Sequence, residues 1–366
     1  MTTVQERPAA TPTRPGGGRL HGLDLLRVLA SATIVYHHVA AWIHGGRNWF
    51  PIGDAVNAAT DTLHLRSELS FVGVALLLLI SGIVVTGVSF RERPVEFLTR
   101  RVARVIPPMW AALPISFAFV VAGLAPSMAA KSHGTLDNLL ADLWFGTYLM
   151  RGHHSILPIT WSLLVQLSFY LFIALTIPLL RRRPWLPPAV AAAAISITMS
   201  LVPEGVAVPT RTIVAFLPIV FIGHVISLVW LGKIRLGVGL LLGAAHFMLF
   251  TRAELVSASM LQGGGYENAL LIDILIVILC MGANGRIATA RWVKVVGKRT
   301  YSVYLLHMPV TFGVMALLQP LVGTPLAAIG ALLAMALAVE VFHRLVEMPV
   351  TKLVRRGLDR RRGERR

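Results

Sequence analysis

Long apolar segments dominate this chain and leave few folds open to it. Most of them approach the roughly 20 residues that a helix needs to cross the hydrocarbon of a bilayer. Helices satisfy their own backbone hydrogen bonds in lipid, and no alternating strand pattern competes with them in this sequence. The sequence therefore predicts an all-α, polytopic transmembrane helical bundle of about ten spans. The ten segments lie near 23–43, 69–89, 105–125, 160–180, 187–203, 212–231, 236–251, 267–284, 300–319 and 325–346.

Basic residues are distributed unequally over the predicted loops. With the N-terminus placed in the cytoplasm, 28 of the 34 Lys and Arg residues fall on the inner side and 6 on the outer side. Inner loops of membrane proteins carry such an excess. We therefore expect cytoplasmic N- and C-termini in a multi-pass protein of the cell membrane. The same rule accounts for the net charge of +17, so we expect the lipid bilayer and no nucleic acid as a partner.

The domain organisation predicted from composition is simple. Residues 1–22, rich in Pro, Gly, Thr and Arg, form a disordered basic tail on the cytoplasmic side. Residues 23–348 form one transmembrane domain, and residues 349–366 form a second basic cytoplasmic tail. Cys280 is the only cysteine, which excludes a disulfide within the chain. No ligand spacing suits a metal ion, so we expect no metal and no bound cofactor.

The first apolar segment carries ionisable residues at membrane depth, where they are costly and are candidates for function. Arg27 and His38 are 11 residues apart, a spacing that places both on one helix face, about 16 Å apart along the axis. Asp24 precedes Arg27 by one turn and can hold its guanidinium. A desolvated, neutral His38 could take a proton from a hydroxyl. Alternatively, Arg27 is an interface anchor and His38 a packed core histidine.

The segment before the third span carries two arginines one helical turn apart. Arg101 and Arg104 share a helix face and precede Pro107 and Pro108. Paired guanidinium groups are suited to bind phosphates, such as those of a coenzyme A ester. Alternatively, these arginines serve only as positive anchors at the cytoplasmic boundary.

Six short motifs follow one another in order along the chain. They comprise Leu23–Arg27 with His38, Ser81–Gly82 after an apolar run, Arg101 with Arg104, Trp161–Tyr170, Tyr301–Pro309, and Glu347–Pro349. In these motifs the chain resembles the acyltransferase-3 group of integral membrane acyltransferases. The resemblance extends over residues 23–349, almost the whole chain. Gln166 departs from it, because many members of the group have glutamate at this position.

This resemblance implies transfer of an acyl group, acetyl or another short one, from acyl-CoA as donor substrate to a hydroxyl. The acceptor would be a sugar, a cell-surface glycan, a glycolipid or a macrolide-like natural product. His38, Arg27 and Asp24 would be catalytic, and Arg101 and Arg104 would bind the donor. The predicted substrate-binding residues are Trp161, Gln166, Tyr304 and His307. The alternative function is a transporter or flippase for an anionic substrate.

Overall fold

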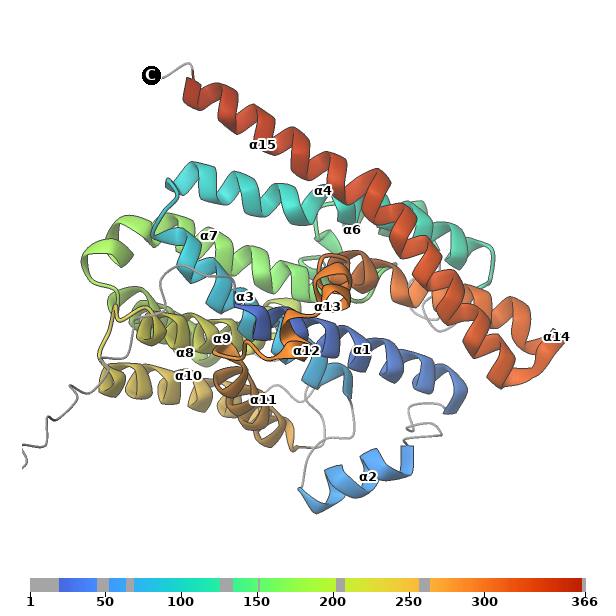
Figure 1. The fold of residues 1–366 in the computed structure, drawn as a ribbon, viewed down its shortest axis with the longest axis horizontal. Coiled ribbons are helices and arrows are strands. Elements are labelled where there is room, and N and C mark those ends of the chain that lie inside the picture. The colour runs from blue at the N-terminus through green and yellow to red at the C-terminus, as the bar shows by residue number, and fades with distance from the viewer. Residues whose placement is uncertain are drawn as a thin grey trace, which may run out of the picture.

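A computed structural model describes residues 20–44, 53–63, 69–125, 134–150, 152–201, 208–256 and 264–363. Within these ranges the secondary structure is entirely helical (Figure 1). The longer helices are α1 (His21–His44), α3 (Leu69–Ser89), α4 (Pro94–Val121), α7 (Thr160–Arg182), α8 (Leu186–Leu201), α9 (Val208–Trp230), α10 (Leu236–Val256), α11 (Tyr266–Met281), α14 (Thr300–Phe342) and α15 (Met348–Gly363). The shorter ones are α2 (Gly53–Thr62), α6 (Leu136–Asp142), α12 (Arg286–Thr289), α13 (Arg291–Gly297), the 3₁₀ turn η1 (Gly146–Tyr148) and the π-helical turn η2 (His343–Glu347).

The helices agree with the predicted apolar segments. Seven helices of the described ranges are long and apolar enough to cross a membrane; six of them match one predicted segment each, and the seventh, Thr300–Arg360, contains the last two. Two further predicted segments correspond to α8 and α11, of 16 residues each. The last two are the limbs of α14, which meet at Gly323, a glycine with φ 75°. Each predicted segment is therefore helical, while the number of ten crossings and the compartment that each end faces stay predictions.

Helix α3 lies inside the bundle and packs most extensively against α1 and α9. A Cβ atom added at Gly82 would lie 2.1 Å from the carbonyl oxygen of Val220. A Cβ atom added at Gly223 would likewise lie 2.1 Å from the carbonyl oxygen of Leu79. Small residues let helix backbones approach closely in membranes, where apolar side chains gain little by leaving lipid. The glycine after Ser81 is therefore a packing residue, and it fixes the position of Ser81 on α3.

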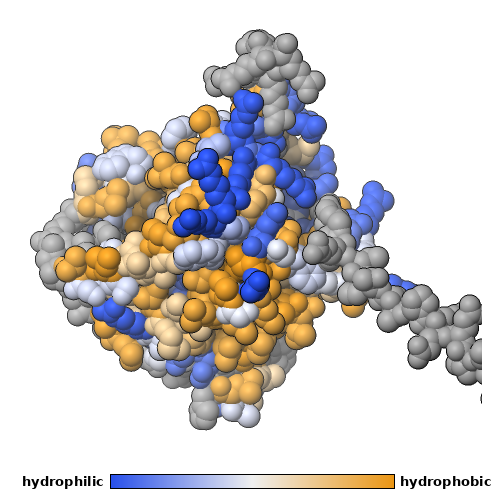
Figure 2. All heavy atoms as spheres, turned by 90° about the vertical axis from the view of Figure 1, so that its left-hand side faces the viewer, coloured by the Kyte–Doolittle hydropathy of each residue, from blue (hydrophilic) through white to orange (hydrophobic). Residues whose placement is uncertain are grey.

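One end of the bundle, here called the basic end, is the end where α3 and α7 stop and α4 starts. Pro94 occupies the first turn of α4. The backbone N–H that proline lacks would have no partner within the helix at this position. Figure 2 views this end and shows hydrophilic side chains gathered above a broad hydrophobic surface. Exposed basic residues at this end include Arg93, directly before α4, and Arg182, the last residue of α7. This is the end that the positive-inside rule predicts to face the cytoplasm.

At the opposite end, residues 134–150 and 152–159 form a folded segment around the carboxylate of Asp142. This side chain is only 1% exposed. Its oxygens accept hydrogen bonds from the Thr147 hydroxyl at 2.5 Å, the Ser155 hydroxyl at 3.1 Å and the Ile156 N–H at 2.6 Å. Burial raises the pKa of Asp142, and these hydrogen bonds oppose the rise. The segment leads directly into the first turn of α7.

The two predicted tails differ in how far the structure describes them. Residues 1–19 lie outside the described ranges, and α1 begins at His21, two residues before the predicted start of the domain. The C-terminal tail is helical as far as Gly363, because α15 continues from α14 through η2. Helix α15 runs beside α4, as Figure 1 shows.

Candidate functional site

A cavity of about 1010 Å³ lies among α1, α3, α4, α7 and α14. Side chains of α3 between Val74 and Val88 form much of its apolar wall, together with Trp230 and Met281 at the ends of α9 and α11. A volume of this size belongs to the upper range of small-molecule sites. The cavity is therefore large enough for an extended ligand.

Five basic side chains line this cavity, and a single carboxylate accompanies them. The carboxylate belongs to Asp24, which is 5% exposed and accepts a hydrogen bond from the Arg27 guanidinium at 2.8 Å. One helical turn separates the two residues, as predicted from their spacing. The cavity thus has an excess of positive charge. Its five basic residues are Arg27, Arg91, Arg101, Arg104 and Lys298.

The arginines at the start of α4 have different partners. Arg100 pairs with Glu92 at 3.3 Å and with Glu96 at 2.7 Å. Arg101 lies over the ring of Phe97, and its buried Nε has no hydrogen-bond partner within the described ranges. The charge of Arg100 is thus balanced by carboxylates, whereas Arg101 turns to the cavity with Arg104. The predicted pair is the pair that the fold brings to the cavity.

Two cavity residues, Arg91 and Lys298, were not predicted as site residues. Arg91 lies in the turn between α3 and α4, and Lys298 lies between α13 and α14. In the sequence both are simply two of the many basic residues in the predicted inner loops. Neither has a spacing relation to another motif that could have distinguished it.

A layer of hydroxyl and amide groups lines the cavity on the side of α7. The Tyr170 hydroxyl donates to Oε1 of Gln166 at 3.1 Å and lies 3.1 Å from the Ser81 hydroxyl. The Tyr304 hydroxyl donates to the Ile159 carbonyl at 3.0 Å and lies 2.6 Å from the Ser162 hydroxyl. Gln166 and Tyr304 therefore face the cavity as predicted. Gln166 accepts a hydrogen bond where a glutamate would bring a negative charge.

The predicted catalytic histidine lies beyond this layer. His38 is partly buried and is absent from the cavity lining, although Arg27 on the same helix belongs to it. The ring centroid of His38 is 5.0 Å from that of His307, and the His307 ring is 6.0 Å from the ring of Tyr304. Tyr304 lines the cavity and neighbours His307, and His307 in turn neighbours His38. Trp161 does not line the cavity and packs on Phe216 with ring centroids 4.5 Å apart.

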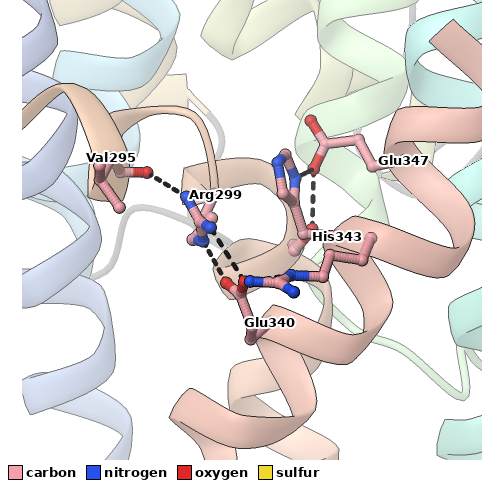
Figure 3. A network of polar contacts seen from close by, with 7 residues as sticks. Val295, Arg299, Glu340, His343 and Glu347 are labelled. Atoms are coloured by element: carbon pink, nitrogen blue, oxygen red, sulfur yellow. Dashed lines mark hydrogen bonds and ion pairs between the residues drawn. The ribbon is translucent and has the colours of Figure 1, made fainter. Parts of the chain in front are cut away.

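A polar network supports the start of α14 behind the cavity (Figure 3). Glu347 in the π-helical turn accepts hydrogen bonds from the Ser302 hydroxyl at 2.8 Å and from Nδ1 of His343 at 2.9 Å. Arg299 pairs with Glu340 nearby. Through Ser302 and Glu347 these contacts join the motifs at 301–309 and 347–349 in space. Among the described residues, no group of three or more His, Cys, Asp or Glu side chains could hold a metal ion.

Comparison with known proteins shows which family the chain belongs to. The sequence profile of an acyltransferase domain matches residues 20–343. The chain is 28% identical over 320 residues to the exopolysaccharide production protein ExoZ of Rhizobium meliloti (strain 1021), which covers 83% of this chain and 96% of that protein. It is 27% identical over 183 residues to nodulation protein 10 of Rhizobium leguminosarum bv. viciae, which covers 45% of this chain and 46% of that protein. No solved structure matches the chain. The residues that line the cavity thus lie within a domain shared along almost the whole length of the chain, which belongs to the acyltransferase-3 family of membrane acyltransferases.

Proposed function

We propose that this acyltransferase moves a short acyl group from an acyl-coenzyme A to a hydroxyl of a sugar. The observation that carries the proposal is the cavity in which five basic side chains meet one carboxylate. That carboxylate already pairs with Arg27. Three of the other basic side chains, Arg91, Arg104 and Lys298, remain exposed, and a cleft lined by charges of one sign attracts ligands of the opposite charge.

The chemistry of coenzyme A fits both walls of the cavity. Its phosphates carry several negative charges, and guanidinium groups bind phosphate oxygens through two parallel hydrogen bonds. Arg101 and Arg104 would hold these phosphates, with Arg91 and Lys298 at the basic end. The pantetheine arm and the acyl chain would lie along the apolar side chains of α3. The thioester would then point toward the hydroxyl layer at Tyr304.

The reaction needs one base and no covalent intermediate with the protein. His38 takes the proton of the acceptor hydroxyl, and the resulting alkoxide oxygen attacks the thioester carbonyl carbon. The bond from this carbon to sulfur breaks, the acyl group remains on the acceptor oxygen, and the thiolate of coenzyme A leaves. The thiolate recovers the proton from His38. Because His38 lies past Tyr304, the thioester has to reach it alongside that ring, and Arg27 and Asp24 would stabilise charge on the cavity side.

A sugar is the acceptor class that the relatives support. One relative is named for exopolysaccharide production. A sugar hydroxyl is also a weak acid, so its attack on a thioester requires a positioned base. The acceptor would be a free glycan, a glycolipid or another glycosylated molecule.

Kinetics with two donors test the donor assignment. The purified protein in lipid nanodiscs is given acetyl-CoA or acetyl-pantetheine, together with a panel of methyl glycosides, and the acetylated sugar is measured by mass spectrometry. In Arg101→Ala with Arg104→Ala we expect the KM for acetyl-CoA to rise more than about 100-fold, because hydrogen bonds to charged groups contribute about 1.5–3 kcal/mol each. Acetyl-pantetheine lacks the phosphates, so its kinetics should be unchanged.

The matched control is Arg93→Ala, since Arg93 is exposed at the basic end and does not line the cavity. It should leave both donors unaffected. His38→Ala should abolish transfer from both donors. An unchanged KM for acetyl-CoA in the double variant would contradict the assignment.

A further inference from the structure

The backbone around His307 determines which nitrogen of its imidazole ring carries the proton. The ring is 0% exposed, and its Nδ1 lies 2.7 Å from the carbonyl oxygen of Tyr304 and 3.1 Å from that of Val303. Carbonyl oxygens only accept hydrogen bonds, so Nδ1 must carry a proton. No described carboxylate pairs with this ring, and a buried cation without a partner is costly. The ring is therefore neutral, and its Nε2 carries a lone pair.

This lone pair has no protein partner in the described part of the chain. Nε2 of His307 is buried and makes no hydrogen bond. Buried polar atoms almost always have partners, so such an exception calls for an explanation. The ring of His38 lies 5.0 Å away between centroids, tilted by 44°. The two rings are not hydrogen-bonded as they stand, but at this separation a rotation of the His38 side chain would bring one of its nitrogens within hydrogen-bonding reach of Nε2.

We infer that His307 is a positioning residue that accepts a hydrogen bond from one ring nitrogen of His38 and leaves the other nitrogen free to face the acceptor hydroxyl. The inference rests on the proposed function, because only there does His38 act as a base. A catalytic base works best when a third group fixes its tautomer and orientation. Carboxylates commonly have this role, whereas here a neutral imidazole has it.

The surroundings of His38 favour His307 over the other nearby rings. Phe312, at 6.4 Å between centroids, offers no acceptor. His37 lies 5.4 Å away in an edge arrangement but is the adjacent residue of α1, whose side chain leaves the helix in a different direction. His307 belongs to another helix and is held by two backbone carbonyl oxygens of α14. It therefore provides a fixed reference for the His38 ring.

Two amide substitutions separate positioning from a purely structural role. In His307→Gln the side-chain amide reaches the position of Nε2 and can accept from His38. In His307→Asn it reaches only the position of Nδ1 and can replace the bond to the Tyr304 carbonyl. With acetyl-CoA and the methyl glycosides, we expect kcat to fall less than 10-fold in His307→Gln and more than 100-fold in His307→Asn. The KM for acetyl-CoA should stay unchanged in both, and His37→Gln should behave as the wild type.

The opposite order would overturn the inference. If His307 only holds the turn of α14 through its Nδ1, His307→Asn retains activity and His307→Gln loses it. Should either variant fail to fold, His307→Ala with added imidazole replaces it, since free imidazole supplies the same acceptor. Rescue of kcat by imidazole supports the inference, and absence of rescue contradicts it.

A spectroscopic measurement separates this inference from the proposed function. Solid-state NMR of the ¹⁵N-histidine-labelled protein in bilayers distinguishes protonated from unprotonated ring nitrogens, and the signals lost in His38→Gln identify His38. We expect one tautomer of His38 in the wild type and in His307→Gln, and a mixture in His307→Asn. A His38 signal that His307→Asn leaves unchanged would contradict positioning even if acyl transfer occurs. A fixed tautomer in a protein that transfers no acyl group would contradict the proposed function alone.

Discussion

The guanidinium of Arg181, near the end of α7, donates a hydrogen bond to the carbonyl oxygen of Ser89, the last residue of α3, over 3.0 Å. It also donates to the carbonyl oxygen of Glu92. Carbonyl groups at the end of a helix lack partners within the helix, and a cation there is favourable. Arg91, which lines the cavity, lies between these two anchored residues. Arg181 therefore holds the turn that places Arg91.

Replacing Arg181 with alanine should weaken donor binding without slowing the chemical step. The lost hydrogen bonds are exposed in part, so we expect an effect of about 1 kcal/mol, which corresponds to a roughly fivefold higher KM for acetyl-CoA. The kcat should remain within twofold, and the melting temperature should fall by a few degrees. Arg182→Ala, which alters an exposed neighbour, serves as the control. A change in kcat with constant KM would contradict this role.

Gly87 offers a way to fill the cavity without disturbing the fold. It lines the cavity, and a Cβ atom added there meets no heavy atom within 4 Å. Gly87→Leu should raise the KM for acetyl-CoA at least 10-fold while the melting temperature stays the same or rises, because leucine favours a helix more than glycine does. Gly237→Leu is the matched control, since Gly237 is an exposed helical glycine with equal space. Equal kinetics in the two variants would show that the donor binds elsewhere.

Two substitutions of Asp24 separate the contribution of its negative charge from that of the hydrogen bond that it accepts from Arg27. Asp24→Asn keeps an oxygen that accepts from Arg27 but removes the negative charge, whereas Asp24→Ala removes both. We expect kcat to fall about 10-fold in the asparagine variant and further in the alanine variant, because a loose guanidinium no longer has a fixed position. Steady-state kinetics with acetyl-CoA provide the measurement. An alanine variant more active than the asparagine variant would argue against an orienting role for Asp24.

The carboxylate of Asp142 gives the folded segment at 134–150 and 152–159 a particular pH dependence. Burial raises the pKa of Asp142 above its unfolded value, so the folded segment binds the proton more tightly than the unfolded one. Its contribution to stability is therefore greatest below the unfolded pKa of about 4 and is lost as the pH rises through the folded pKa. We expect amide hydrogen exchange in this segment, corrected for intrinsic rates, to show declining protection over that window.

Asp142→Asn should remove this decline, although the segment should be less stable at every pH because the amide cannot accept all three hydrogen bonds. Tyr148 provides an internal reference, since burial raises the pKa of its hydroxyl to about 12 and it stays protonated throughout. A slope that is the same in Asp142→Asn and the wild type would assign the pH dependence to other groups.

The helices were predictable because lipid imposes length and hydropathy on each of them. The alignment of Asp24 with Arg27, and of Arg101 with Arg104, was predictable because each pair lies within one helical turn. The separation of His38 from the cavity was not predictable from the sequence, because it depends on Tyr304 and on how α14 packs against α1. Arg91 and Lys298 were missed for the same reason. They become neighbours only when the turns that carry them meet in space.

The π-helical turn His343–Glu347 determines the helical phase of everything that follows it. A π turn is equivalent to one residue inserted into an α-helix, so it rotates the next helix by about 100° about the common axis. Here that rotation leaves Lys352, Arg355 and Arg356 of α15 exposed while the helix packs beside α4. Deleting a single residue within the turn would rotate α15 about its axis relative to α4. The basic side chains of α15 would then face another direction, although the composition of α15 would be unchanged.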